Sequence, residues 1–285
     1  MQTDHKGTAL PLLPKISIVT PSFNQGRYLE QTMRSVLEQR YENLEYIVVD
    51  GGSTDESAQI IRRYEGQLAY WCSQPDGGQA DAIARGFERS TGEILGWLNS
   101  DDAYLPGALR SVGQFFADHP ESEAVSAGAY KIDENGRPWA GNRVPYTLGV
   151  ASSFNRFRFF PQEGVYQQAT FFRRSAYEAA GGLDRGLQFI MDLDLFVRLA
   201  ARKRFGRLPR LIAAFRMHGA SKTSTLSKVW KAELNIFQQR YIRSRRVAVA
   251  GRALRLWYKT LYFGYRCLLL GLLRTGVVKL KAVEL

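Results

Sequence analysis

Two adjacent carboxylates, Asp101 and Asp102, closely follow a short apolar run at residues 94–98. Carboxylates at the carboxyl end of a buried strand lie where open α/β sheets bind their ligands. Mg²⁺ and Mn²⁺ prefer such oxygen ligands, commonly one or two carboxylates together with substrate phosphates. The pair therefore predicts a divalent-cation site. The alternative is a strand that ends in a polar turn, because Asn99, Ser100 and the aspartates are also ordinary turn residues.

Two further groups of polar residues could carry chemistry. Asp192 and Asp194 begin a helical pattern with cations farther on, which the helix dipole favours. The alternative is that these acids simply charge the start of the helix. A basic cluster follows an apolar run at 211–215 and contains His218. A lone histidine is more often structural. Here the neighbouring residues favour phosphate binding; they are Arg216, Ser221 and Lys222.

Strands that alternate with helices must position these groups. The apolar runs cover residues 16–20, 46–49, 68–71 and 94–98, and each ends in a polar, acidic or glycine-containing loop. Helical patterns separate the runs, which predicts crossover units and a mostly parallel, doubly wound α/β sheet. Because the carboxyl ends of parallel strands meet at one edge of a sheet, we expect these loops to converge there. The pattern continues with a helix at 106–117, a strand at 123–130 and a strand-like run at 168–172.

The glycines in these loops do not form a phosphate cradle. No Gly-x-Gly-x-x-Gly follows a strand, and no Gly-x-x-x-x-Gly-Lys-Ser/Thr is present. The expected cleft is therefore suited to a single nucleotide held through carboxylates and a metal. Residues 133–162 are irregular and rich in arginine, proline and aromatics, which is typical of an acceptor-facing loop region.

The composition of the 285 residues is that of an ordinary protein with a real core, large enough for one domain with an appendage. Cys72 and Cys267 match no metal or redox spacing, so we expect a reducing compartment. Residues 1–14 are short and mixed and lack the apolar core of a signal peptide. The sequence thus predicts a flexible amino-terminal tail at 1–14 and a cytoplasmic protein.

Positive charge is concentrated near the carboxyl terminus. Residues 198–285 hold 21 Lys and Arg against 2 Asp and Glu, whereas residues 1–197 hold 18 against 25. Cations fall within an arc of about 100° on a helical projection, opposite apolar and aromatic residues; they are Arg252, Arg255, Lys259, Arg266 and Arg274. The apolar run 267–273 is far shorter than the about 20 residues of a membrane span.

This tail predicts an in-plane interfacial helix on an anionic membrane surface, at the cytoplasmic face. The alternative is a helix packed against the catalytic body or another subunit, with solvated cations. Nucleic acid is not an expected partner, because no nucleic-acid-binding motif accompanies the charge.

Taken in order, the motifs resemble those of family 2 glycosyltransferases. The matching stretches are residues 17–24, 49–55, 75–79, 98–102, 191–195 and 216–223. The resemblance implies the nucleotide-sugar-binding GT-A fold, with its Rossmann-like sheet, over residues 15–225. A basic amphipathic helical segment would then occupy 226–285.

The resemblance also implies roles for residues of the nucleotide pocket. Pro21 and Phe23 would line the base pocket, with Phe23 stacked on uracil or another base. Asp50 and Asp55 would hold the base and ribose end. Asp76 either adds to the same pocket or caps a turn. The family often has a second acid where this chain has Gly51.

Further roles concern the phosphates and the reaction itself. Asp101 would contact the ribose, Asp102 would bind Mn²⁺ or Mg²⁺, and His218 would approach the metal or the diphosphate. Arg216, Ser221 and Lys222 would form the phosphate or acceptor region. Asp192 would be the general base. This chain departs from the family pattern at two positions where the family often has an acid; they are Asn99 and Met191.

The predicted function is that of an inverting, metal-dependent glycosyltransferase. It would move a sugar from a nucleoside-diphosphate sugar, with UDP as the expected nucleotide, to a hydroxyl of a saccharide or lipid-linked acceptor in polysaccharide or glycolipid synthesis. One alternative is a nucleotidyltransferase, which would need a basic, glycine-rich loop near the first strand. Another is a non-catalytic carbohydrate- or membrane-binding protein on the same scaffold. The sequence specifies neither sugar, acceptor, linkage nor oligomeric state.

Overall fold

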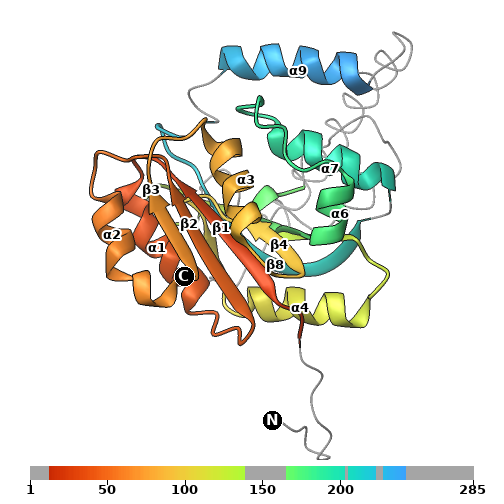
Figure 1. Ribbon diagram of the computed structural model, residues 1–285, viewed down its shortest axis with the longest axis horizontal. Helices are drawn as coiled ribbons and strands as arrows, with labels where there is room; N and C mark the ends of the chain where they lie inside the picture. The colour runs from red at the N-terminus through yellow and green to blue at the C-terminus, as the bar shows by residue number, and fades with distance from the viewer. Residues whose placement is uncertain (1–12, 139–164, 203–204, 223–226, 242–285) are drawn as a thin grey trace, which may run out of the picture.

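The amino-terminal apolar runs form the parallel half of one eight-stranded sheet (Figure 1). Its strands are β1 (Ile16–Ser22), β2 (Leu44–Asp50), β3 (Tyr70–Ser73) and β4 (Ile94–Trp97). β1 pairs in parallel with both β2 and β4, and β2 pairs in parallel with β3. The computed structural model describes residues 13–138, 165–202, 205–222 and 227–241. The predicted α/β class is confirmed.

The second half of the sheet is mixed. It contains β5 (Ala103–Tyr104), β6 (Ala124–Ile132), β7 (Thr170–Arg173) and β8 (Gly206–Arg216), and the strand order is β3-β2-β1-β4-β7-β6-β8-β5. β7 runs antiparallel to both of its neighbours, β4 and β6. β8 begins before the predicted run at 211–215. The apolar pattern misses its first residues because they include exposed polar positions such as Arg207 and Arg210.

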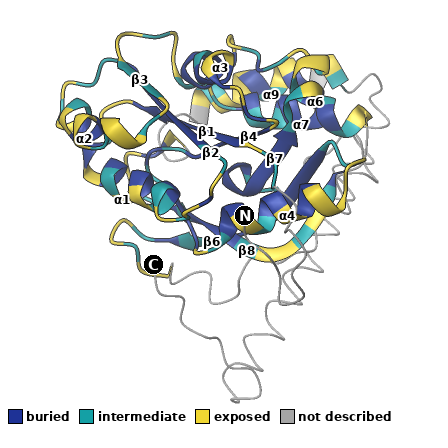
Figure 2. Cartoon of the chain, turned by 60° about the horizontal axis from the view of Figure 1, so that its bottom comes forward, coloured by how far each residue is buried: buried dark blue, intermediate teal, exposed yellow. Residues whose placement is uncertain are grey.

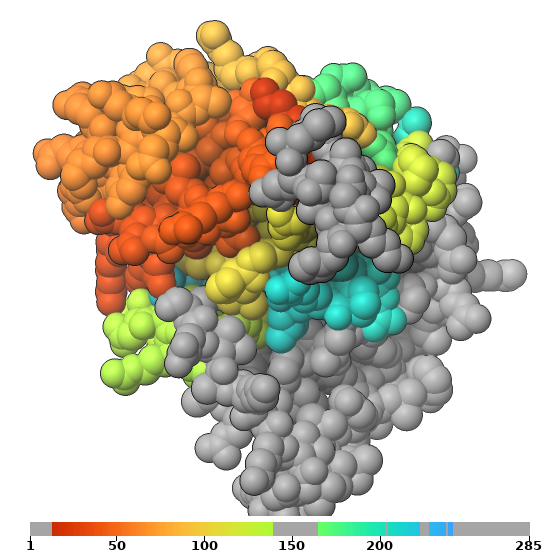
Figure 3. Space-filling view, turned by 90° about the horizontal axis from the view of Figure 1, so that it is seen from below, coloured from red at the N-terminus to blue at the C-terminus, as the bar shows by residue number. Residues whose placement is uncertain are grey.

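Helices cover both faces of this sheet, and their outer sides are exposed, while the central strands β1, β2 and β4 are buried (Figure 2). They are α1 (Gly26–Leu37), α2 (Ser57–Arg63), α3 (Gln79–Arg89), α4 (Ala108–Asp118), α6 (Arg174–Ala179), α7 (Met191–Arg202) and α9 (Ser227–Tyr241). Short 3₁₀ turns lie at Glu65–Gln67 and Gln167–Ala169. Seen from below, the amino-terminal elements lie beside the yellow and cyan segments of the second half (Figure 3).

The alternation of side chains along the strands builds two apolar cores. In β1, Ile16 and Ile18 face the core under α1, α2 and α4, whereas Val19 faces the core under α3 and α7. Tyr46 and Ile47 of β2 divide in the same way. A strand buried on both faces is apolar along its whole length, which explains the continuous runs in the sequence.

The connections change direction between β1 and β4. The chain steps from β1 outward through β2 to β3, and then crosses back to place β4 on the other side of β1. A crevice is expected outside the carboxyl ends of two such strands. The loop after residue 22 and the turn at 99–102 both begin at this point.

The carboxyl-terminal helix α9 lies close to α7 (Figure 1), and its Phe237 joins the same apolar core as Leu195 and Phe196 of α7. Within the described residues, no helix is both long and apolar enough to cross a bilayer. The predicted interfacial helix and most of the predicted acceptor loop fall at 242–285 and 139–164, outside the described residues.

Candidate active site

The turn after β4 brings Asp101 and Asp102 to the edge of the sheet but exposes them differently. Asp102 is fully buried, and its Oδ1 accepts a hydrogen bond of 2.9 Å from the backbone N–H of Arg216. Its Oδ2 has no hydrogen-bond partner among the described residues. Burial, followed by the neighbouring charge of Asp101, raises the pKa of Asp102 well above its ordinary value. Asp101 is partly exposed, and its Oδ2 lies 3.0 Å from Nε2 of His218.

His218 reaches Asp101 from the loop after β8. Its side chain is 4% exposed, and its ring lies 4.8 Å from the ring of Tyr28, centroid to centroid. The backbone N–H of Ser221 donates to the carbonyl of His218, which closes the loop, and Ser221 itself is buried. The structure therefore pairs a carboxylate and an imidazole from two distant parts of the chain.

This pair supplies two of the ligand types that a divalent cation takes. Among the described residues, no three His, Cys, Asp or Glu side chains come together as a complete metal-binding group. Mg²⁺ and Mn²⁺ in nucleotide sites usually take few protein ligands and complete their coordination with phosphates and water. The oxygen of Asp101 and the nitrogen of His218 are acceptable ligands for Mn²⁺. The residues therefore fit a cation that is bound together with a diphosphate.

Arg216 holds the acidic turn in place through hydrogen bonds of its buried side chain. It is 2% exposed, and its Nε donates to the carbonyl of Asp101 at 2.8 Å. Its Nη1 donates to the carbonyl of Asp133 at 3.2 Å, and its Nη2 to Oε1 of Gln31 at 2.5 Å. The guanidinium also lies over the ring of Tyr28, 4.9 Å from its centroid. Protein acceptors occupy these donors, and the predicted contact of Arg216 with phosphate or acceptor stays a prediction.

Asp50 ties the ends of β2 and β3 together. It is fully buried, and its Oδ2 accepts hydrogen bonds from the backbone N–H of Ser53 at 2.9 Å and from Oγ of Ser73 at 2.7 Å. Its Oδ1 accepts from Oγ of Ser53 at 2.5 Å. These hydrogen bonds shape the loop after β2, and they leave the carboxylate little capacity for a nucleotide.

Asp55 joins the first turns of two helices. Its Oδ2 accepts from the backbone N–H of Gly26 at 2.8 Å, and its Oδ1 accepts from that of Ser57 at 3.0 Å. Both N–H groups belong to helix starts, where backbone donors lack intrahelical partners. Asn24, with φ of 51°, accepts from the N–H of Thr54 and thereby fastens the loop after β1 to the loop after β2.

The same two loops present an exposed aromatic ring. Phe23 is 61% exposed at the end of β1, while Pro21 within the strand is buried. Large exposed aromatic residues often mark a binding surface. The ring of Phe23 is therefore available to stack on a base, as the sequence predicts.

Asp76 borders the position where the second acid of the motif is missing. A side chain at Gly51 would place its Cβ 2.9 Å from Oδ2 of Asp76. The Oδ1 atom of Asp76 accepts a hydrogen bond of 2.7 Å from the backbone N–H of Gly78, so the predicted turn-capping contact is present. Burial is the main cause of the raised pKa of Asp76. The carboxylate of Asp76 thus occupies the space beside the loop that a residue at 51 would fill.

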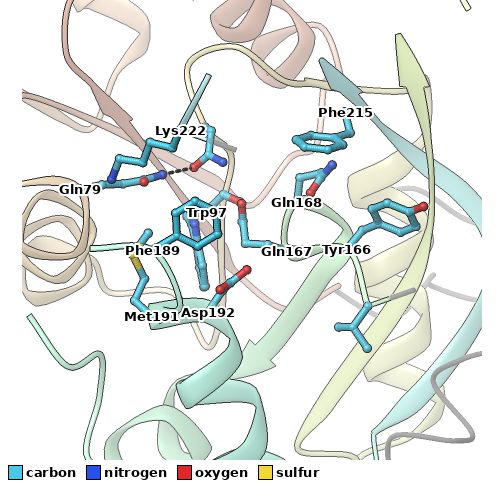
Figure 4. A pocket seen from close by; sticks show the side chains of 12 residues that line it. Gln79, Trp97, Tyr166, Gln167, Gln168, Phe189, Met191, Asp192, Phe215 and Lys222 are labelled. Carbon is cyan, nitrogen blue, oxygen red and sulfur yellow. Dashed lines mark hydrogen bonds between the residues drawn. The ribbon is translucent and has the colours of Figure 1, made fainter. Parts of the chain in front are cut away.

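Asp192 lines a cavity of about 240 Å³ at the start of α7 (Figure 4). Its Oδ1 accepts a hydrogen bond of 2.7 Å from the backbone N–H of Leu193. Although the cavity leaves part of Asp192 accessible, desolvation by the surrounding protein raises its pKa to about 6. The nearby charge of Lys222 opposes this shift. A carboxylate of this pKa is ionised at neutral pH and basic enough to accept a proton.

The cavity also contacts the turn that carries Asp101. Asn99 lines the cavity, and its Oδ1 accepts a hydrogen bond of 2.6 Å from Nε2 of Gln79 (Figure 4). Lys222, at the start of the segment after His218, is another lining residue, and its Nζ donates to the carbonyl of Gln188 at 3.1 Å. The acidic turn, the histidine loop and the start of α7 therefore meet at one site.

Several lining residues have no feature in the sequence that marks them as part of a binding site. They are Trp97, Val165, Tyr166, Gln167, Gln168, Phe189 and Phe215. Gln79 belongs to a matching motif, but its contact with Asn99 depends on how α3 packs beside β4. Asp194 points away from the cavity, as helical spacing predicts, and forms an ion pair of 2.7 Å with Arg198.

Comparisons with known proteins identify the family of the chain. The family model described as "Glycosyl transferase family 2" matches residues 17–181. An uncharacterized glycosyltransferase of Mycobacterium tuberculosis is 32% identical over 190 residues, which are 66% of this chain and 69% of that protein. The minor teichoic acid biosynthesis protein GgaA of Bacillus subtilis is 30% identical over 200 residues, 67% of this chain and 44% of that protein.

Solved structures show the same fold at low sequence identity. S. aureus TarS 1–349 in complex with UDP-GlcNAc gives a TM-score of 0.58 at 19% identity, over 74% of this chain and 61% of that chain. The mannosyltransferase PcManGT from Pyrobaculum calidifontis in complex with GDP-Man and Mn²⁺ gives 0.57 at 19% identity, over 82% of this chain and 66% of that chain. The chain thus spans less than two thirds of each structure. The predicted GT-A type of α/β fold is confirmed.

Proposed function

Because the chain belongs to glycosyl transferase family 2, we propose that it is an inverting enzyme that uses a nucleoside-diphosphate sugar as donor and a hydroxyl group as acceptor. One observation carries the proposal. The cavity that holds Asp192 shares Asn99 with the turn of the Asp101–His218 pair. A base and a diphosphate-binding pair are therefore neighbours, as a displacement at an anomeric carbon requires.

The nucleotide binds at the carboxyl ends of β1 and β2. Phe23 stacks on the base, beside Pro21. Asp76, whose carboxylate lies next to Gly51, contacts the base or the ribose. Asp50 and Asp55 act mainly by shaping the two loops, since their oxygens already accept hydrogen bonds from serine and backbone groups. UDP is the proposed nucleotide. The complex of TarS with UDP-GlcNAc supports this choice, although PcManGT is a complex with GDP-Man.

The divalent cation binds at Asp101 and His218. This assignment revises the sequence-based preference for Asp102, which is buried and bonded to the backbone of Arg216, whereas Asp101 directly faces the histidine. When bound, Mn²⁺ or Mg²⁺ supplies positive charge that neutralises the leaving diphosphate. Lys222 adds a cation at the rim of the cavity, and Ser221 closes the loop that carries His218.

Asp192 is the general base. The acceptor hydroxyl gives its proton to the Asp192 carboxylate as its oxygen bonds to the anomeric carbon, and the bond from that carbon to the diphosphate oxygen breaks. Attack from the face opposite the diphosphate inverts the configuration. The raised pKa of about 6 suits a base that is ionised at neutral pH.

The acceptor is a saccharide or lipid-linked saccharide of a cell-surface polymer. The name of GgaA, minor teichoic acid biosynthesis protein, supports this class. The concentration of 21 Lys and Arg in residues 198–285 supports peripheral binding to an anionic membrane on its cytoplasmic face, which would suit a lipid-linked acceptor.

A screen of nucleotide sugars tests the proposal. The full chain is mixed with each sugar nucleotide and Mn²⁺, and thermal stabilisation and released nucleoside diphosphate are measured without acceptor. We expect one donor to stabilise the protein and to release UDP slowly, and chelation by EDTA to abolish both effects. Release of pyrophosphate from UTP and a sugar phosphate, with no release of UDP, would instead identify a nucleotidyltransferase. Stabilisation without turnover of any donor would indicate a binding protein.

A further inference from the structure

Glu233 is the sole acidic residue between Asp194 and Glu284 in the sequence, within its most basic part. It lies on α9, yet its side chain turns away from solvent and the residue is 6% exposed. A buried carboxylate without partners is strongly unfavourable, so its contacts identify what it stabilises.

The carboxylate accepts hydrogen bonds from three successive backbone N–H groups. Oε1 accepts from Gln188 at 2.7 Å, and Oε2 accepts from Phe189 at 2.9 Å and from Ile190 at 3.0 Å. These residues immediately precede α7, which begins at Met191. Only the N–H of Ile190, the residue directly before α7, belongs to the unpaired donors of the helix start, where the helix dipole also favours negative charge. Gln188 and Phe189 lie in the bend that leads into the helix. Glu233 therefore caps the start of α7 and holds the bend before it, from a different helix.

The rest of α9 is fastened along the same face. Trp230 contacts Phe189 with ring centroids 6.5 Å apart, and Phe237 is buried in the core beside α7. Tyr241 donates to Oδ1 of Asp194 at 2.7 Å. Positions 230, 233, 237 and 241 follow helical spacing, so one stripe of α9 makes all of these contacts.

The capped segment is also a wall of the active-site cavity. Phe189, Met191 and Asp192 line the cavity, and Asp192 lies two residues after the last N–H that Glu233 accepts. Lys222 binds the same segment from the opposite side of the peptide, through the carbonyl of Gln188. A change in this segment would therefore move the proposed base relative to the acceptor.

We propose that Glu233 is a positioning residue for the reaction, because it fixes residues 188–190 and thereby sets the place of the Asp192 carboxylate in the cavity. The proposal rests on the proposed function, in which Asp192 is the general base. It makes α9 a part of the active site, although the helix follows the stretch that matches the family.

Glu233→Gln tests the proposal with little change in volume. A glutamine offers one acceptor oxygen and one NH₂ group, so whichever way it turns, its NH₂ faces at least one backbone N–H. We expect kcat to fall by about tenfold or more, because small displacements of catalytic groups have large effects. The Mn²⁺-dependent affinity for UDP should stay within about twofold, since Asp101 and His218 lie on the loops after β4 and β8 and not on the segment that Glu233 holds. The matched control is Lys231→Gln, at an exposed position of the same helix, which should keep wild-type kinetics.

Hydrogen exchange supplies a second readout. In Glu233→Gln the amides of residues 188–190 should exchange faster, while those of α4 stay protected. If the variant does not fold, Trp230→Ala, which loosens the same segment through Phe189, replaces it with the same readouts. Wild-type kcat with accelerated exchange at 188–190 would overturn the proposal, and so would a parallel loss of kcat and UDP affinity.

Asp192→Asn separates this proposal from the one on which it rests. If Asp192→Asn abolishes transfer while Glu233→Gln retains it, the positioning role alone is refuted. If Asp192→Asn transfers sugar normally, the base assignment is refuted, and the positioning role with it.

Discussion

Replacement of Asp192 by asparagine is the most informative perturbation, because the structure predicts its effects on both activity and stability. Asparagine keeps the shape of the side chain but cannot take a proton from an acceptor hydroxyl. Loss of a general base typically lowers turnover by about 10²–10⁴-fold. Binding of UDP should be unchanged, because the proposed nucleotide pocket lies at the ends of β1 and β2.

The pH dependence follows from the raised pKa of Asp192, about 6. In the wild type, kcat/KM should be half-maximal near pH 6 and should fall about tenfold for each pH unit below it, because kcat/KM reports the base of the free enzyme and that base becomes protonated. The Asn variant should lack this acidic limb.

Asp192→Asn should lower activity but raise the stability of the folded protein. A carboxyl group whose folded pKa is raised destabilises the folded protein where the group is ionised. The cost is absent below its ordinary pKa near 4 and complete above pH 6. The shift from about 4 to about 6 corresponds to at most about 3 kcal/mol, and water in the cavity reduces this value. Asp192→Asn should therefore raise the melting temperature at pH 8 but not at pH 4.

Three measurements check this reasoning: steady-state transfer from pH 5 to pH 9, calorimetric UDP binding, and thermal melts at pH 4 and pH 8. Near-wild-type transfer by Asp192→Asn would remove the residue from the mechanism. A variant less stable than the wild type at pH 8 would refute the burial argument even if activity were lost.

The remaining predictions concern the donor site and the tail. Asp101→Ala should lower the Mn²⁺-dependent affinity for UDP by about tenfold or more, whereas Asp102→Asn should leave that affinity nearly unchanged. Calorimetry with and without Mn²⁺ compares the two variants. A larger loss of affinity in Asp102→Asn than in Asp101→Ala would restore Asp102 as the metal ligand. Phe23→Ala should weaken UDP binding by about 1–3 kcal/mol without a change in melting temperature, because the exposed ring packs on little protein; equal UDP affinity would exclude stacking. Truncation after Arg246 should reduce flotation with anionic liposomes, and equal flotation of full-length and shortened protein would contradict a membrane role for the tail.

Much of the first half of the fold can be predicted from the sequence, because its signals are local. The strands of the parallel half are buried on both faces and therefore appear as continuous apolar runs, such as residues 16–20 and 46–49. The antiparallel direction of β7 cannot be predicted in this way, because the pairing of a four-residue strand depends on its neighbours, β4 and β6. β8 is extended by exposed polar residues that resemble a loop in the sequence.

The candidate site divides in the same way. The motifs alone indicate that Asp101, Asp192 and His218 belong to one functional set. The resemblance assigns the metal to Asp102, but the motif does not reveal which of the two aspartates is buried. Adjacent residues in a turn differ in exposure only once Arg216 packs against one of them.

The parallel α/β core, the family and the chemical types of the site residues can be inferred from the sequence, because each depends on short stretches of chain with their own pattern. Only the packing of distant segments shows that Arg216 holds the acidic turn and that Glu233 caps the helix of Asp192. These contacts join residues more than forty positions apart, as between Glu233 and Ile190. Their hydrogen-bond partners are backbone groups, which are the same in every residue and therefore leave no trace in the sequence.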